Sequence, residues 1–170
     1  VCLGRSGDMG GLRVAGWRRR GQALARPILI ASSEQFVTIR LAYSADASDT
    51  LEAVFVPSTH DAATAVMAPP HPLYGGNLAN PVVSEIADAC QRTGLASLRF
   101  NWRGVGASAG AVSSEPEIGV SDYTAALAYV ESHSQGAIVA CGYSFGAASG
   151  ASAARKSERV KALLLVAPPV

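Results

Sequence analysis

The chain has 170 residues, of which 49% are hydrophobic and 16% charged, against about 25% charged in an average soluble protein. This length and composition fit one domain with a heavily buried interior and exclude a largely disordered chain. The formal net charge is +1 and no stretch approaches ~18 apolar residues, so we expect neither nucleic-acid binding nor a membrane span.

Residues 1–32 are expected to form a leader ahead of a domain over residues 33–170. The segment 1–27 is rich in glycine and arginine, has Asp8 as its one acidic residue, and lacks the apolar run of a signal peptide. It is disordered, translated from a mistaken start codon, or a transit segment, which would direct the protein to an organelle. Otherwise the three scattered cysteines, Cys2, Cys90 and Cys141, favour a reducing compartment and a cytoplasmic location.

An antiparallel hairpin is predicted at the start of the domain. Apolar and polar residues alternate over 36–43, which is the period of a strand with one buried face. The segment 44–49 contains Ser and Asp residues typical of turns, and 51–56 is a second strand-like run.

The rest of the chain alternates between apolar strands and helices. The predicted order is strand 63–68, helix 82–93, strand 95–100, helix 119–133, strand 137–141, helix 147–156 and strand 160–166. Asn80-Pro81 opens the first of these helices and Gly94 ends it. This alternation, with strands that are apolar on both faces, predicts a doubly wound, mostly parallel sheet between helices.

The sequence Gly142-Tyr143-Ser144-Phe145-Gly146 lies between a predicted strand and a predicted helix. A G-x-S-x-G segment in this position is typical of a nucleophile elbow, in which Gly142 and Gly146 permit a tight, strained turn around the serine. We expect Ser144 Oγ to stand clear of the sheet, and the N–H of Phe145 to be one oxyanion donor. The alternative is an ordinary serine in a glycine-rich turn.

The segment His71-Pro72-Leu73-Tyr74-Gly75-Gly76-Asn77 follows strand 63–68. In a doubly wound sheet this loop opens at the carboxyl ends of the strands, so it is expected to face Ser144. Because proline has no N–H, a second oxyanion donor has to come from His71, Leu73 or Tyr74. We expect Leu73 and Tyr74, because Gly75 and Gly76 let the loop fold back towards the elbow, with His71 on the pocket rim. The alternative is a stiff connector with His71 hydrogen-bonded locally.

Residues 101–110 form a glycine-rich loop with the sequence Asn-Trp-Arg-Gly-Val-Gly-Ala-Ser-Ala-Gly. The glycines superficially suggest a phosphate loop, but their spacing differs from a dinucleotide fingerprint and no strong helix follows directly. We expect a structural turn at the pocket rim, in which the guanidinium of Arg103 ties loops together. Nucleotide binding by this loop is the weaker alternative.

The three loops, each after its own predicted strand, resemble the α/β-hydrolase superfamily. More narrowly, P-H-P-L-Y-G-G-N, L-R-F-N-W-R-G-V-G-A-S-A-G and G-Y-S-F-G-A are similar to a small lidless branch of predicted serine hydrolases, related to dienelactone hydrolases and serine aminopeptidases. The resemblance covers residues 34–170. It implies a nucleophile at Ser144, oxyanion donors at Phe145 and in the 71–74 loop, and neither cofactor nor metal.

Two features depart from the pattern of that branch. Pro69 stands where its members often have a histidine. The superfamily order is serine, then acid, then histidine, but after Ser144 the chain has Glu158 as its one carboxylate and no histidine. We interpret Glu158 as a solvated surface charge.

None of the upstream histidines is expected to replace the missing base. His60 lies between two strands, His133 precedes a strand at the opposite end of the sheet, and His71 approaches from the oxyanion side. We therefore expect a fragment whose triad acid and histidine lie beyond Val170, with the leucines at 163–165 near an exposed sheet edge.

The sequence thus predicts an α/β-hydrolase-type fold with its last strands missing. The predicted function is a serine hydrolase that cleaves an ester, thioester or amide of a small-molecule acyl substrate through an acyl-enzyme at Ser144. Without a base, the chain is expected to be inactive as given. The alternative is a non-catalytic module that binds a ligand or partner on the same fold. No sequence feature indicates an oligomeric state.

Overall fold

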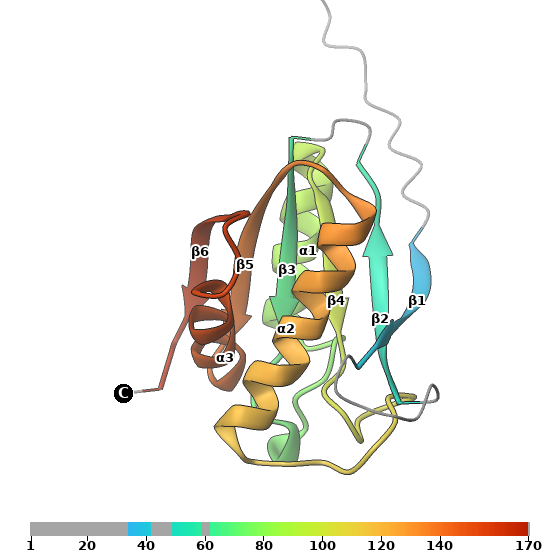
Figure 1. Cartoon of the computed structure of the whole chain (residues 1–170), viewed down its shortest axis with the longest axis vertical. Coiled ribbons are helices and arrows are strands. Elements are labelled where there is room, and N and C mark those ends of the chain that lie inside the picture. Colours follow the sequence, from blue (N-terminus) through green and yellow to red (C-terminus); the bar gives the residue numbers. More distant parts are fainter. Residues whose placement is uncertain (1–33, 42–48, 59–61, 170) are drawn as a thin grey trace, which may run out of the picture.

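A six-stranded sheet with helices on both faces is formed by the residues that the computed structural model describes, 34–41, 49–58 and 62–169 (Figure 1). The elements are β1 (Gln35–Arg40), β2 (Thr50–Val56), β3 (Ala63–Ala68), the 3₁₀ turn η1 (Pro72–Tyr74), α1 (Pro81–Thr93), β4 (Ala96–Phe100), α2 (Pro116–His133), β5 (Ala137–Tyr143), α3 (Phe145–Ala154) and β6 (Val160–Val166). Every predicted strand and helix is present.

The strand order is β1-β2-β4-β3-β5-β6. β1 pairs antiparallel with β2, which confirms the predicted hairpin, and β2 pairs antiparallel with β4. β3 lies between β4 and β5 and is parallel to both, and β6 is parallel to β5. The parallel strands therefore end together, at the lower end of the sheet in Figure 1, where η1 and the start of α3 also lie.

α1 has the bounds that its capping residues predict. Asn80 Oδ1 accepts the N–H of Val82 at 3.0 Å, and Gly94 ends the helix with a φ of 75°. α2 begins at Pro116 and not at the predicted residue 119, because proline is well suited to the first helical turn, where its missing N–H is not needed.

The boundaries around Ser144 also differ from the prediction. β5 runs to Tyr143, and α3 spans Phe145–Ala154 and not 147–156. The physical reason is that the turn between strand and helix consists of Ser144 alone. The predicted bounds leave a longer turn, from Gly142 to Gly146.

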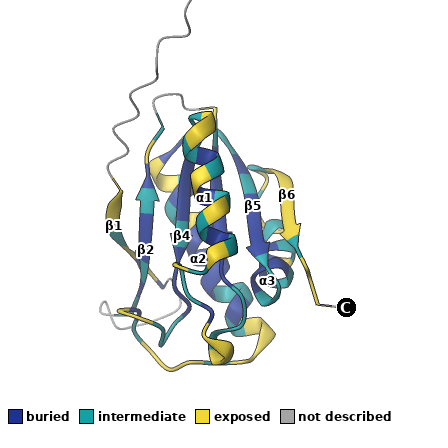
Figure 2. Ribbon diagram, turned by 180° about the vertical axis from the view of Figure 1, so that it is seen from behind, coloured by how far each residue is buried: buried dark blue, intermediate teal, exposed yellow. Residues whose placement is uncertain are grey.

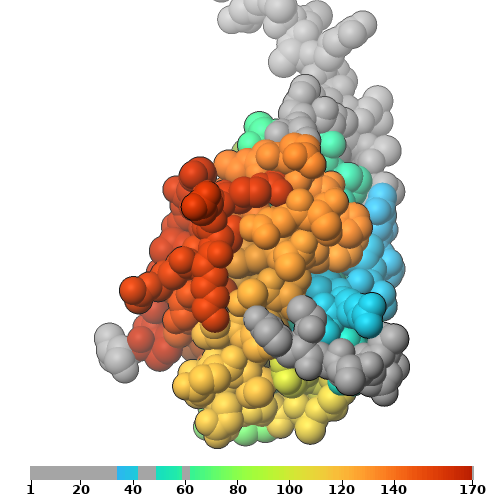
Figure 3. Space-filling view, in the orientation of Figure 1, coloured from blue at the N-terminus to red at the C-terminus, as the bar shows by residue number. Residues whose placement is uncertain are grey.

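The two faces of β3 belong to two cores. Ala65 and Met67 pack with residues of α1, whereas Val66 and Ala68 belong to the larger core beneath α2 and α3. α2 and α3 lie side by side on the face shown in Figure 3, and the view from behind in Figure 2 shows α1 on the other face. The alternation of side chains along a strand thus gives this apolar segment two buried faces.

β6 is an edge strand with both faces open to solvent. The exposed fractions of Leu163, Leu164 and Leu165 are 49%, 44% and 36%, and Figure 2 shows exposed β6 beside buried β5. The prediction of an exposed apolar edge is confirmed.

Several predictions concern residues outside the described ranges, among them the leader 1–32, most of the turn 44–49, and His60. Within the described ranges, no helix is long and apolar enough to cross a bilayer. Cys90 and Cys141 are free and buried. The cytoplasmic location stays a prediction.

Candidate active site

Ser144 occupies a strained position between β5 and α3. Its φ is 54° and its ψ −116°, in a region that L-residues avoid at a cost of about 1–3 kcal/mol. The backbone is held on both sides: the Ser144 N–H donates to Val166 O at 2.9 Å, and the Ser144 carbonyl accepts from the Ala147 N–H at 2.9 Å. The neighbouring β6 and the first turn of α3 therefore keep the serine in this conformation.

Gly142 and Gly146 are required by space. A Cβ on Gly142 would lie 2.3 Å from the carbonyl carbon and oxygen of Gly146, and a Cβ on Gly146 would lie 2.4 Å from the carbonyl oxygens of Ala68 and Pro69. Real Cβ contacts are not this short. The G-x-S-x-G spacing thus allows the elbow to pack directly against the end of β3.

The start of α3 presents unused donors beside Ser144. Among the described residues, none accepts a hydrogen bond from the main-chain N–H of Phe145, and the Ser144 hydroxyl neither caps the helix nor has another hydrogen-bond partner. A helix N-terminus carries a partial positive charge. An anionic oxygen next to Ser144 would be stabilised there.

The 71–77 loop lies beside the elbow, as predicted. The His71 ring has its centroid 4.9 Å from that of Phe145 and 4.9 Å from that of Tyr74. A Cβ on Gly76 would lie 2.0 Å from Pro70 O, and Gly75 has a φ of 80°. The two glycines therefore let the loop fold back tightly on its own prolines.

The two donors expected in this loop are already engaged. The Leu73 N–H donates to His71 Nδ1 at 3.2 Å, and the Tyr74 N–H donates to His71 O at 3.1 Å. His71 is therefore hydrogen-bonded within its own loop, as in the alternative of a stiff connector. The His71 N–H has no acceptor in the described part of the chain, so it replaces Leu73 and Tyr74 as the candidate second donor.

Arg103 anchors the 101–110 loop to the helix α2. Its main-chain N–H donates to Asp122 Oδ2 at 3.0 Å, its Nε donates to Asp122 Oδ1 at 2.8 Å, and its Nη2 also contacts Oδ1. Asp122 is 1% exposed. The guanidinium charge is thus matched by a buried carboxylate, and Trp102 Nε1 ties the same loop to Pro70 O at 2.9 Å.

The same loop is closed by Glu52, which disfavours a phosphate there. Glu52 Oε2 accepts from Asn101 Nδ2 at 2.7 Å and from the Ala107 N–H at 2.9 Å. Asn101 Oδ1 in turn accepts from the Leu78 N–H at 2.7 Å, which joins this loop to the residues after η1. A carboxylate already occupies donors that a phosphate loop would offer to its ligand.

The hydroxyl of Tyr123 on α2 lies within hydrogen-bond distance of both β3 and β5, near their carboxyl ends. Its hydroxyl lies 2.7 Å from Val66 O and 2.9 Å from Cys141 O, and the residue is fully buried. This role of Tyr123 was not predicted from the sequence, and neither were those of Asp122 and Glu52. The signal that could have indicated it is the hydroxyl of Tyr123, a polar group on a residue of an apolar helix face, which needs a hydrogen-bond partner when buried.

The described histidines and Glu158 do not complete a triad. His133 stacks on Tyr129 with ring centroids 4.0 Å apart, at the far end of α2, and Glu158 is exposed. His71 Nδ1 is occupied by the Leu73 N–H. Among the residues described, no three potential metal ligands come together.

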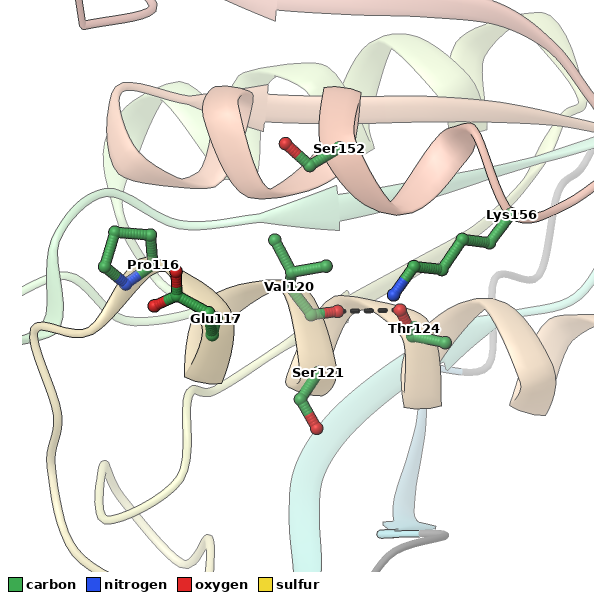
Figure 4. A pocket seen from close by; sticks show the side chains of 7 residues that line it. All are labelled: Pro116, Glu117, Val120, Ser121, Thr124, Ser152 and Lys156. Carbon is green, nitrogen blue, oxygen red and sulfur yellow. Dashed lines mark hydrogen bonds between the residues drawn. The ribbon is translucent and has the colours of Figure 1, made fainter.

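Two hollows lie near these elements. The larger, of about 420 Å³, is a groove between α2 and α3 with Glu117 and Lys156 towards its two ends, and it does not include Ser144 (Figure 4). The smaller is a narrow crevice beside the elbow that has no room for a water molecule. Its lining residues are Pro72, Trp102, Arg103, Ser113, Ile118, Gly119, Asp122 and Phe145. Arg103 lines this crevice with its charge paired to Asp122.

Known proteins share this arrangement. Residues 75–170 match the sequence model of a family described as serine aminopeptidase, S33. The uncharacterized protein RP471 of Rickettsia prowazekii is 34% identical over 113 residues, which are 65% of this chain and 47% of that protein. The chain thus spans about half the length of this curated relative.

Solved structures of α/β hydrolases superimpose on most of the chain. An α/β serine hydrolase homologue from Coxiella burnetii is 34% identical, with a TM-score of 0.69 over 80% of this chain and 64% of that one. An α/β serine hydrolase without a lid from Xanthomonas campestris is 27% identical, with a TM-score of 0.69 over 80% of this chain and 62% of that one.

Proposed function

The chain belongs to the serine aminopeptidase S33 family, and on that premise we propose that it forms the nucleophile-bearing part of a serine hydrolase with Ser144 as the nucleophile. The substrate is a small molecule with an ester, thioester or amide bond. The observation that carries this proposal is the strained Ser144, whose free hydroxyl lies beside the unpaired N–H of Phe145.

The reaction follows from the groups around Ser144. Its Oγ bonds to the acyl carbon while its proton passes to a base, and the carbonyl oxygen becomes an oxyanion. The N–H groups of Phe145 and His71 are the candidate donors to that oxyanion, and the start of α3 adds its dipole. The leaving group takes a proton and departs, and water then releases the acid from the acyl-enzyme.

The base is not provided by the described histidines, whose ring contacts are local. General-base assistance typically contributes about 10²–10⁴-fold, so the 170-residue chain alone is proposed to react slowly at Ser144. Added imidazole is a small base that can reach an open site. It should therefore accelerate the reaction of Ser144.

A fluorophosphonate probe tests this proposal by labelling reactive serines. We expect slow labelling of the chain, acceleration by imidazole, and loss of both in Ser144→Ala. Ser152→Ala is the matched control, because Ser152 is exposed on the same helix, and it should label like the unmodified chain. Labelling that persists in Ser144→Ala would refute the assignment of the nucleophile. Fast labelling without imidazole would refute the proposed lack of a base.

A second candidate is a non-catalytic module that binds a ligand in the same place. It is favoured by one observation, the engagement of both described histidines away from Ser144. This candidate predicts no labelling at any imidazole concentration, in a chain that is folded by circular dichroism.

A further inference from the structure

Two apolar side chains stand in solvent next to the elbow. Leu73 and Tyr74 on η1 have exposed fractions of 59% and 88%. Monomeric proteins expose single apolar residues commonly, but adjacent ones beside a concave site often mark binding. Phe36 on β1 is 78% exposed and lines neither of the two hollows described above, so it serves below as a comparison.

The turn holds these side chains out rigidly. The N–H groups of Leu73 and Tyr74 donate to His71, and those of Gly75 and Gly76 donate to Pro72 O at 3.2 Å and His71 O at 3.1 Å. Asn77 Nδ2 adds a hydrogen bond to Gly75 O at 3.0 Å. Because these donors are satisfied within the turn, Leu73 and Tyr74 remain displayed in the free protein.

A row of ring contacts connects Tyr74 with Phe145, the residue that follows Ser144. The rings of Tyr74, His71, Phe145 and Trp102 follow one another with centroid separations of 4.9, 4.9 and 5.3 Å. Tyr74 is at the solvent end and Trp102 is buried. Pro72, on the same turn, also lines the crevice beside Phe145.

The charge in this region is neutralised. Arg103 and Asp122, the two charged residues that line the crevice, are bonded to each other. A ligand group that lies between η1 and the elbow therefore meets no unpaired carboxylate among the described residues that line the crevice, so an ammonium group would lose hydration there without compensation. The unpaired groups nearby are the N–H donors of Phe145 and His71, which suit the carbonyl oxygen of an ester.

We propose that Leu73 and Tyr74 bind the hydrocarbon arm of the substrate, which is an uncharged ester with an alkyl or aryl group. The identity of this substrate class rests on the proposed function at Ser144. The binding step itself needs no reaction and can be measured without one.

The experiment uses the full chain with Ser144→Ala, so that no ester is cleaved. Methyl butyrate, methyl hexanoate and methyl octanoate are titrated into ¹⁵N-labelled protein, and the dissociation constants are read from amide shifts of the 71–77 loop. We expect the affinity to rise with chain length, by up to about fourfold for each added methylene that becomes fully buried. The double variant Leu73→Ser, Tyr74→Ser should lose most of this dependence, whereas Phe36→Ser should keep it.

Two results would overturn the proposal. One is an affinity that does not change with chain length, and the other is an unchanged dependence in the double variant. The variants alter exposed side chains, and thermal unfolding checks that the fold is kept. Failure at this step is distinct from failure of the proposed function, which the labelling of Ser144 decides separately.

Discussion

The hydroxyl of Tyr123 permits a direct test of how β3 and β5 are held together beneath the elbow. It lies within hydrogen-bond distance of two main-chain carbonyls, Val66 O and Cys141 O. Burial raises the pKa of Tyr123 well above its ordinary value, so the hydroxyl keeps the proton that it donates. Tyr123→Phe removes the donor and keeps the ring, which packs against Gly150 and Phe100.

The expected loss in the free energy of unfolding is about 1–3 kcal/mol, the cost of leaving buried carbonyl oxygens without their donor. For a domain of this size each kcal/mol lowers Tm by about 2–4 °C. Urea unfolding followed by circular dichroism measures the free energy, and the midpoint should fall with an unchanged slope.

Tyr129→Phe is the matched control, because it lies on the same helix and its hydroxyl has no hydrogen bond among the described residues. It should change the stability by less than about 0.5 kcal/mol, the usual range for substitutions away from such features. Equal effects of the two variants, or a Tyr123→Phe protein as stable as the unmodified chain, would refute the reasoning.

Two further substitutions test the packing around Ser144. Gly146→Ala should destabilise the protein by about 1–3 kcal/mol, because the added methyl group would overlap Ala68 O and Pro69 O. This exceeds the gain of about 1 kcal/mol from the higher helix propensity of alanine. A higher free energy of unfolding in urea would contradict this prediction. Burial, with a smaller effect of Cys90, raises the pKa of the Cys141 thiol from 9.0 to about 12. The folded protein then retains a proton that the unfolded chain loses, so stability should fall between pH 9 and 12 by at most about 1.4 kcal/mol per pH unit. Urea unfolding measured across that pH range should show that the free energy of unfolding falls less steeply with pH in Cys141→Ala than in the unmodified chain. Equal slopes in the two proteins would contradict the assignment of this pH dependence to the buried Cys141 thiol.

The elements could be predicted because their signals are local. One short stretch contains the apolar run of β5, the G-x-S-x-G segment and the small residues of α3. Together they predicted the elbow and its position at the carboxyl end of β5. Asn80 and Gly94 fixed both ends of α1 through their own hydrogen bonds and backbone angles. α2 begins at Pro116. The predicted start at residue 119 did not use this proline as a signal for the first helical turn.

The hydrogen bonds of the 71–77 loop could not be predicted from the same kind of signal. Leu73 and Tyr74 were expected because Gly75 and Gly76 give the loop freedom, whereas the hydrogen bonds within η1 depend on how the His71 side chain turns. The pairing of Arg103 with Asp122 and the hydroxyl contacts of Tyr123 join residues from separate elements. Such contacts follow from the tertiary fold and leave no periodic mark in the sequence.

The hydrogen bond from the Ser144 N–H to Val166 O couples the elbow to the edge of the sheet. Among the described strands β6 pairs with β5 alone, and its leucines are exposed, two features that favour local opening. Each opening of β6 frees the Ser144 N–H and lets the strained backbone relax from its positive φ. A change that loosens β6 would therefore also loosen the backbone of Ser144, although the two residues of this bond lie in different elements.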